Sequence, residues 1–286
     1  VSVYDAYGKT RQHAIFHVDW DLSSAEKGGY AHYMLKEIHE QPTALQSTFT
    51  PRAGTPGQYS WLPVTPQEAR ALRKISIVAC GTAYHAGVLG KYAIERLARV
   101  PVEAEIASEY RYRDPIVGEN ELFIAVSQSG ETADTLAALR EAKRRGARVM
   151  AICNVVGSTI TREVGEENTL YTYAGPEIAV ASTKAYITQA ELMVMLAVAL
   201  ADLRGQISPE RAAQLMEGLA DLPRKAEQAL AVEEQLQRLT SMLSQKRHVF
   251  FVGRGMDYAL SMEAALKLKE VSYIFSEAYA AGELKH

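Results

Sequence analysis

The stretch LFIAVSQSGETADTLAAL, at Leu122–Leu139, joins an apolar run, a short polar turn and a periodic segment. Leu122–Val126 is apolar throughout and has the length of one buried strand. After the turn, apolar residues recur at helical spacing, namely Ala133, Leu136, Ala137 and Leu139. The sequence therefore predicts a strand, a tight turn and a helix.

The turn Ser127–Thr132 carries three hydroxyl groups, the amide of Gln128 and a glycine. The first turn of a helix has unpaired N–H groups and about half a positive charge, which together suit a phosphate. Gly130 would let the backbone approach a ligand, and the hydroxyls would add donors. An ordinary serine N-cap is the alternative. Glu131 favours that alternative, because a carboxylate in the first turn satisfies the dipole without a ligand.

Composition narrows the class of protein. The 286 residues suffice for one large or two modest domains, and 48% hydrophobic with 23% charged residues permits a packed core. A net charge of −3, without a basic cluster interleaved with aromatics, argues against nucleic-acid binding. Two cysteines, Cys80 and Cys153, predict free thiols in a reducing compartment. The longest apolar run, near Leu192–Ala201, is short for a membrane span, and no leader pattern opens the chain, so we expect a cytoplasmic protein.

Strand-like and helix-like segments alternate from residue 73 onward. Because the strands are apolar throughout, the pattern predicts a doubly wound α/β fold with a parallel sheet covered on both faces. Ligands of such sheets bind beyond the carboxyl ends of the strands, where strand order reverses, so Gly81–Ala83 and Ser127–Thr132 are expected to line one crevice. No GxGxxG motif with an acidic partner follows, which argues against a dinucleotide. The predicted strands are Ile75–Cys80, Val102–Ile106, Leu122–Val126, Val149–Cys153 and Thr169–Tyr173.

The segments on either side of this core are less regular. Alternation at Val1, Val3 and Ala14–Trp20 predicts a hairpin with one buried face. Tyr30–Gln41 reads as a short helix stopped by Pro42, and residues 51–66 as a loop. Further on, Ser182-Thr183 and Ser208-Pro209 are predicted to cap two helices.

A second α/β unit is predicted from His248 onward. It would have one strand, His248–Val252, and one helix, Tyr258–Tyr273, before the sequence ends. Since one strand and one helix cannot close an α/β layer, and the sequence starts within a strand pattern, we expect the chain to be part of a longer protein.

The predicted helix after residue 258 has a charged stripe. Glu263, Lys267 and Glu270 fall within roughly 60° of one another on a helix. Apolar residues flank the stripe on both sides, and a carboxylate held among apolar groups next to an ammonium is how a general base is placed. An exposed ion pair at i,i+4 spacing is the alternative.

Four motifs resemble a known family. CGTAYHAG at 80–87, SQSGETADTL at 127–136, AGPEIAVASTKAY at 174–186 and EAALKLKEVSYIFSEAYAAGELKH at 263–286 closely resemble the isomerase domain of the glutamine–fructose-6-phosphate aminotransferase (glucosamine-6-phosphate synthase) family. KGGYAHYMLKEIHEQP at 27–42 is similar to the segment that joins this domain to a glutaminase domain. SQSGET by itself marks the wider sugar isomerase (SIS) family.

This resemblance implies a domain organisation. Residues 1–29 would be the end of the glutaminase domain with its linker, and 30–72 a linker helix and loop. Residues 73–244 would form a first SIS domain with its following helices, and 245–286 the start of a second, truncated one.

The resemblance also assigns residues. Ser127, Gln128, Ser129 and Thr132 would hold the sugar phosphate, while Thr82, Ala83 and the backbone of Val180 would lie by the sugar. Many family members have Ser where this chain has Ala83, which removes one hydroxyl. Glu270 would be the base that moves a proton between C1 and C2, with Lys267 nearby. His286 would assist ring opening from the neighbouring subunit, which implies a homodimer.

The implied reaction converts fructose 6-phosphate and glutamine to glucosamine 6-phosphate and glutamate, without a metal or organic cofactor and with no nucleic-acid or membrane partner. The cysteine that hydrolyses glutamine would lie before Val1 and the lysine that forms the imine after His286, so this polypeptide by itself is expected to be inactive. An SIS sugar-phosphate sensor, or a deglycase or isomerase without a glutaminase, stays open as an alternative. The charged stripe and the linker motif favour the synthase.

Overall fold

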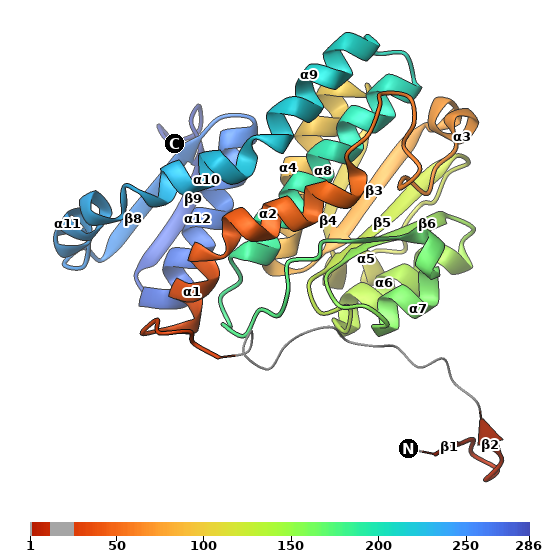
Figure 1. Ribbon diagram of the computed structural model, residues 1–286, viewed down its shortest axis with the longest axis horizontal. Helices are drawn as coiled ribbons and strands as arrows, with labels where there is room; N and C mark the ends of the chain where they lie inside the picture. Colours follow the sequence, from red (N-terminus) through yellow and green to blue (C-terminus); the bar gives the residue numbers. More distant parts are fainter. Residues whose placement is uncertain (1, 12–25) are drawn as a thin grey trace.

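The centre of the molecule is a five-stranded parallel sheet (Figure 1). We analysed a computed structural model, in which residues 2–11 and 26–286 are described. The strand order is β4-β3-β5-β6-β7 and every pairing is parallel, which confirms the predicted sheet. Its strands are β3 (Lys74–Ala79), β4 (Val102–Ile106), β5 (Glu121–Ser127), β6 (Arg148–Cys153) and β7 (Thr169–Tyr171).

Strand order reverses between β3 and β5. After β3 the chain builds β4 on one side, and then returns to add β5 on the other side of β3. The loops that follow β3 and β5 therefore lead away to opposite sides and leave a crevice at the carboxyl edge of the sheet. The predicted meeting of the two loops is thereby set by the topology.

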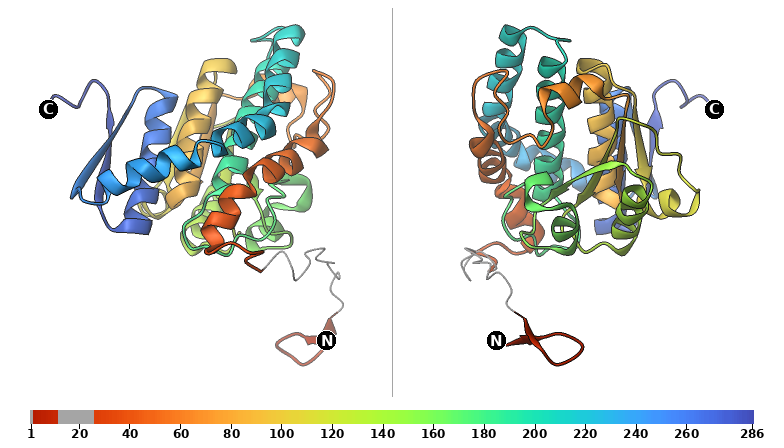
Figure 2. Two further views of the ribbon diagram at one scale, coloured as in Figure 1. Left: turned by 60° about the vertical axis from the view of Figure 1, so that its left-hand side comes forward. Right: turned by 90° about the vertical axis from the view of Figure 1, so that its right-hand side faces the viewer.

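Helices cover both faces of the sheet, as predicted (Figure 2). Along β5, Ile124 and Val126 face the core that includes α4 (Gly81–Leu97) and α8 (Lys184–Leu203). Phe123 faces the opposite core, which α5 (Ala107–Tyr112), α6 (Ala133–Arg144) and α7 (Thr159–Val164) complete. Because successive side chains of a strand point to opposite faces, a strand that is apolar throughout serves both cores.

Helix α8 is the central helix of the larger core. By length and composition its 20 residues could cross a membrane, with a mean hydropathy of 1.5. However, 72% of its apolar window is buried inside the fold. It packs against α4 and α2 (Gln41–Phe49), which is the environment of a core helix.

The N-terminal part differs from the prediction in two ways. β1 (Val3–Tyr4) and β2 (Thr10–Arg11) form a hairpin, but both are exposed rather than buried on one face, and Ala14–Trp20 lies outside the described residues. α1 (Tyr33–His39) confirms the predicted helix. Pro42 does not simply end it, because the proline sits in the first turn of α2, where a missing N–H costs nothing.

Short elements connect the larger ones. The segment 51–66 is mostly loop, as predicted. Ser208 caps α9 as predicted, its Oγ accepting from Arg211 N at 3.2 Å. The remaining short elements are η2 (Thr50–Arg52), α3 (Pro66–Ala71), η3 (Glu166–Asn168), α9 (Pro209–Ala220), α10 (Leu222–Leu230) and α11 (Glu233–Leu243).

The last unit is larger than predicted. β8 (His248–Gly253) and α12 (Met256–Ser272) were expected, but β9 (Phe275–Ala280) follows and pairs with β8 in parallel. The six residues of β9, FSEAYA, form neither an apolar run nor a strict alternation, and its pairing with β8 shows that it is a strand. α12 packs between this pair and α4, which brings its charged stripe toward the main sheet.

Candidate functional site

A pocket of about 290 Å³ opens at the carboxyl ends of β3 and β5. It brings together segments that lie up to 190 residues apart in the sequence. Every residue assigned to the site by resemblance lines it, with the exception of His286. The lining residues are Cys80, Thr82, Ala83, Val126, Ser127, Gln128, Ser129, Thr132, Glu177, Ala179, Val180, Ser182, Gln189, Lys267 and Glu270.

The hydroxyls of the turn do not cap α6. Ser127 Oγ accepts from Gly130 N at 3.0 Å and lies 3.2 Å from Thr132 Oγ1. Ser129 Oγ accepts from Glu131 N at 3.2 Å. Thr132 is the N-cap residue, yet among the described residues its side chain makes no capping bond. The serine N-cap alternative is therefore wrong, and the first amides of α6 stay available to an anion.

Glu131 acts on a different helix from the one its position in the sequence suggests. Its carboxylate accepts from Thr159 N at 2.8 Å, at the first residue of α7. Hydrogen bonds from the side chain and backbone of Thr159 lower the pKa of Glu131. The interpretation in which Glu131 satisfies the α6 dipole is thus wrong.

Close packing against α7 and β6 requires a glycine at position 130. Its φ is +68°, and a Cβ at this position would lie 2.0 Å from Ser158 Oγ and 2.9 Å from Cys153 Sγ. Its carbonyl oxygen accepts from Ile160 N at 3.0 Å. The turn is therefore held tightly against the start of α7.

A second helix also begins at the pocket. α4 starts at Gly81, whose φ is +54°, and its N-cap residue Cys80 makes no side-chain capping bond within the part of the chain that is described. Two uncapped helix N-termini thus face one cavity and favour negative charge there. Thr82 Oγ1 donates to Glu263 Oε1 at 3.0 Å, so this hydroxyl joins α4 to α12.

The charged stripe of α12 divides into two parts. Glu263 is only 5% exposed, and its Oε2 lies 2.7 Å from Nδ1 of His85 on α4. Lys267 pairs with Glu263 at 3.5 Å and also with Glu270, and Lys267 and Glu270 line the pocket. The exposed-pair alternative is wrong for Glu263. The expected burial of the whole stripe among apolar residues is also wrong, because the flanking Val271 is exposed.

The loop before α8 forms a further wall of the pocket, and it contains a residue that the sequence analysis missed. Glu177 Oε1 accepts from Thr183 N at 2.8 Å and from Ala185 N at 3.2 Å, while Ser182 donates to Oε2 at 2.8 Å. Glu177 therefore caps α8, and the predicted Ser182-Thr183 cap is wrong. Val180 lies in this loop and lines the pocket, and its side chain is fully exposed.

The pocket also contains Gln189, a buried polar side chain whose amide oxygen is unpaired within the described part of the chain. It is 1% exposed, and its Oε1 has no hydrogen-bond partner among the described residues. Leaving a buried acceptor unpaired costs about 1–3 kcal/mol, which favours a ligand or water at this position. The signal of it in the sequence is a polar side chain within a mostly apolar helix, a signal that the neighbouring Thr188 and Glu191 share.

His286 lies apart from the pocket. It is exposed, and its N–H donates to Glu283 O at 3.0 Å. Its proposed role from a neighbouring subunit stays a prediction. Within residues 2–11 and 26–286, no group of three or more His, Cys, Asp or Glu side chains could hold a metal ion. Cys80 and Cys153 are free thiols, as predicted.

Comparison with known proteins agrees with this geometry. The model of the SIS domain family matches residues 70–199 and 242–286, more than half of the chain. The chain belongs to the SIS domain family. The resemblance stated from the SQSGET motif is thereby confirmed.

Relatives of this SIS chain are named as one enzyme. The chain is 54% identical, over its whole length, to a glutamine–fructose-6-phosphate aminotransferase [isomerizing] of Clostridium tetani, and 45% identical to that of Methanosarcina acetivorans. It spans about half the length of these relatives, 47% and 46%.

Solved structures support the same assignment. The C-terminal domain of glucosamine-fructose-6-phosphate aminotransferase from Francisella tularensis superposes with a TM-score of 0.85 at 43% identity, over 91% of this chain and 73% of that one. A glucosamine-6-phosphate deaminase from Thermotoga maritima, 24% identical over 89% of this SIS chain and 72% of that one, has a TM-score of 0.65 and shows the shared fold alone.

Proposed function

We propose that this SIS chain binds fructose 6-phosphate in the pocket beyond β3 and β5. In this proposal it is the isomerase part of an enzyme that makes glucosamine 6-phosphate and glutamate from fructose 6-phosphate and glutamine. One observation carries the proposal: an uncapped helix N-terminus with three hydroxyls shares a pocket with a Lys–Glu pair. The identity to the named aminotransferases supports it.

The phosphate group is assigned to the turn before α6. Ser127, Gln128, Ser129 and Thr132 line the pocket there, and the first amides of α6 add donors and a positive dipole. Thr82, Ala83 and the backbone of Val180 would contact the sugar. Because Ala83 has no hydroxyl, one contact that a serine offers is absent from this chain.

The isomerisation is assigned to α12. Glu270 would remove a proton from C1 of the protonated ketose imine, so that the C1–H electron pair forms a C1=C2 double bond while the C2=N pair moves onto nitrogen. It would then return the proton to C2 as the C1 hydroxyl gives up its proton, which the amine can take up, and C1=O forms to give the 2-amino aldose. The ammonium of Lys267 contacts the carboxylate of Glu270, and both side chains line the pocket.

The remaining parts of the proposal concern assembly. His286 of a neighbouring subunit would assist ring opening, which requires a homodimer. Residues 1–29 would end a glutaminase domain that supplies ammonia from glutamine, 30–72 would connect it, 73–244 would be the first SIS domain, and 245–286 would begin the second. Free thiols at Cys80 and Cys153 fit a cytoplasmic enzyme.

Binding of fructose 6-phosphate to the 286-residue chain, measured by titration calorimetry, tests the proposal. Inorganic phosphate should compete with fructose 6-phosphate for the pocket. The double variant Ser129→Ala, Thr132→Val should lower the affinity for both ligands about tenfold or more. Ser261→Ala changes a serine of α12 that lies outside the pocket lining; it is the matched control and should leave the affinity for both ligands unchanged. Absence of competition, or equal affinity in the double variant, would refute the phosphate site.

A further inference from the structure

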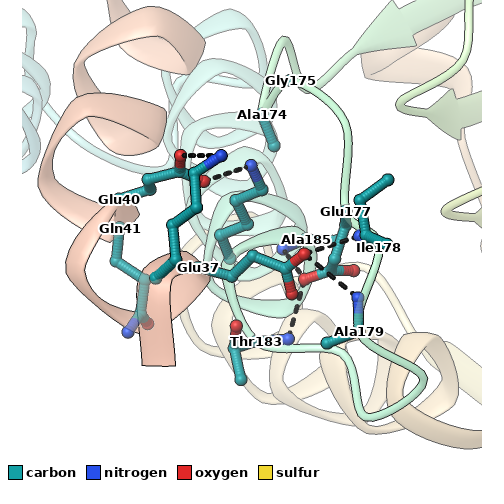
Figure 3. Close-up of polar contacts among 12 residues, drawn as sticks. Glu37, Glu40, Gln41, Ala174, Gly175, Glu177, Ile178, Ala179, Thr183 and Ala185 are labelled. Carbon is teal, nitrogen blue, oxygen red and sulfur yellow. Dashed lines mark hydrogen bonds and ion pairs between the residues drawn. The ribbon is translucent and has the colours of Figure 1, made fainter. Parts of the chain in front are cut away.

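The carboxylate of Glu37, on α1, hydrogen-bonds the loop before α8 that forms one wall of the pocket. Glu37 Oε1 accepts from the backbone N–H of Ile178 at 2.5 Å and of Ala179 at 3.1 Å (Figure 3). Glu37 is only 2% exposed although it is charged in its ordinary state. A buried carboxylate is costly unless it accepts hydrogen bonds, so this contact is specific rather than incidental.

The two amides that Glu37 binds lie in the part of the loop that faces the pocket. Ala179 and Val180 line the cavity, whereas Glu37 does not. Glu177 fixes the same loop to the start of α8 from the other end. Because one oxygen accepts two consecutive N–H groups, it fixes the two peptide groups on either side of Ile178, directly before the pocket-lining Ala179 and Val180.

Helix α1 is itself attached beside this loop. Glu40, one turn after Glu37, pairs with the buried Lys184 of α8 at 2.7 Å. The wall is thus held by a helix about 140 residues earlier in the chain, and not only by its own neighbours.

We propose that Glu37 is a positioning residue for the sugar part of the ligand. It acts through the backbone of Ile178 and Ala179, which places Val180 against the sugar, and it makes no contact with the phosphate cradle at Ser127–Thr132. This inference rests on the proposed function, since it concerns the same pocket.

The test compares two ligands on three variants of the full 286-residue chain. Glu37→Ala removes the acceptor, Glu37→Gln keeps an acceptor oxygen, and Glu95→Ala is the matched control. Glu95 also accepts a backbone N–H, from Val102 at 3.0 Å, but on α4 and outside the pocket lining. Calorimetry measures the affinity for fructose 6-phosphate and for inorganic phosphate, and hydrogen exchange follows the amides of Ile178 and Ala179.

Glu37→Ala should lower the affinity for fructose 6-phosphate about tenfold and leave that for inorganic phosphate within about twofold. Protection of the two amides should fall at the same time. Glu37→Gln should keep most of the affinity for fructose 6-phosphate and most of the amide protection. Glu95→Ala should change neither the affinity nor the protection. If Glu37→Ala does not fold, Glu37→Asp, which shortens the side chain, should give a smaller loss in the same direction.

Unchanged affinity for fructose 6-phosphate in Glu37→Ala, or an equal loss for both ligands, would overturn the positioning role while the phosphate site stands. Binding of neither ligand by the unaltered chain would instead overturn the proposed function, and the inference with it.

Discussion

Glu131, in the turn before α6, hydrogen-bonds the backbone N–H of Thr159 at the first residue of α7, at 2.8 Å. The carboxylate of Glu131 is thereby engaged by another helix. The acidic residue in the first turn of α6 is Asp134, whose carboxylate pairs with Arg111 at 2.8 Å, so an ion pair partly offsets its charge at the point where an anion is proposed to bind. The anion site therefore depends on a contact between residues 28 positions apart.

Glu131→Ala should destabilise the fold without weakening phosphate binding. Loss of a helix cap costs typically about 1 kcal/mol in the free energy of unfolding. Because the pKa of Glu131 is lowered, its contribution is present above the usual carboxyl pKa and is lost as the pH falls. Urea unfolding at pH 7 and pH 3 checks this, and a weaker phosphate affinity would contradict it.

Gly130→Ala should strongly destabilise the turn. The added Cβ would clash with Ser158, and a positive φ costs an L-residue roughly 1–2 kcal/mol more. Ser158→Gly in the same chain removes the clashing atoms and should recover part of the loss in urea unfolding. If the double variant is no more stable than Gly130→Ala, the contact with Ser158 is not the cause.

Gln189→Leu should separate stability from binding. Leucine of similar size removes a buried oxygen that lacks a partner among the described residues, so the free energy of unfolding of the ligand-free chain should stay equal or rise by about 1 kcal/mol. The affinity for fructose 6-phosphate should fall, because an acceptor in the pocket is lost. Thermal unfolding with and without ligand measures both, and a variant that binds more tightly would argue against a ligand role.

Glu191→Gln should change how stability depends on pH. Burial raises the pKa of Glu191 to about 8, with Arg52 opposing the shift, and both carboxyl oxygens lack hydrogen-bond partners in the described part of the chain. A raised folded-state pKa means that stability falls as the pH rises from about 4.5 toward 8, on the order of 1.4 kcal/mol per pH unit at most. Glutamine cannot ionise, so its unfolding free energy should lose this slope. If the unfolding free energies of the unaltered chain and of Glu191→Gln depend on pH in the same way, Glu191 is not the group responsible for the slope.

Glu270→Gln should abolish proton transfer but preserve binding. General base catalysis contributes typically 10²–10⁴-fold, and the amide cannot accept the proton. In the complete protein, exchange of the C1 proton of the sugar with solvent deuterium measures this step, and calorimetry measures affinity. Turnover that survives the change would show that Glu270 is not the base.

Much of the fold follows from local patterns. The strand predicted at Val102–Ile106 has the same bounds in the structure, and the helix predicted from the spacing of Ala133, Leu136, Ala137 and Leu139 is α6. Predictions failed where a local pattern was ambiguous. β9 was missed because its residues, FSEAYA, form neither an apolar run nor a strict alternation. Pro42 was taken as the end of a helix although it lies in the first turn of the next one.

The site shows the same division between local pattern and tertiary contact. Residues in motifs, such as Ser127–Thr132 and Lys267, were found because their neighbours in the sequence identify them. The sequence analysis missed Glu37, Glu177 and Gln189. Glu37 and Glu177 are distinguished by hydrogen bonds to the loop and to the start of α8, and Gln189 by an oxygen without a partner among the described residues, and no local pattern encodes these features.

The sequence by itself determined the alternation of strands and helices in the five-stranded sheet, the membership of the SIS family and the motif residues that line the pocket, because periodicity and motif spacing are properties of neighbouring residues. Only the tertiary structure decided which polar groups the fold uses for itself and which it leaves for a ligand. Glu131 is used by α7 and Glu263 by α4, whereas the α6 amides and Gln189 Oε1 remain without partners among the described residues. That division arises from hydrogen bonds between distant segments, whose geometry exists only once the chain is packed.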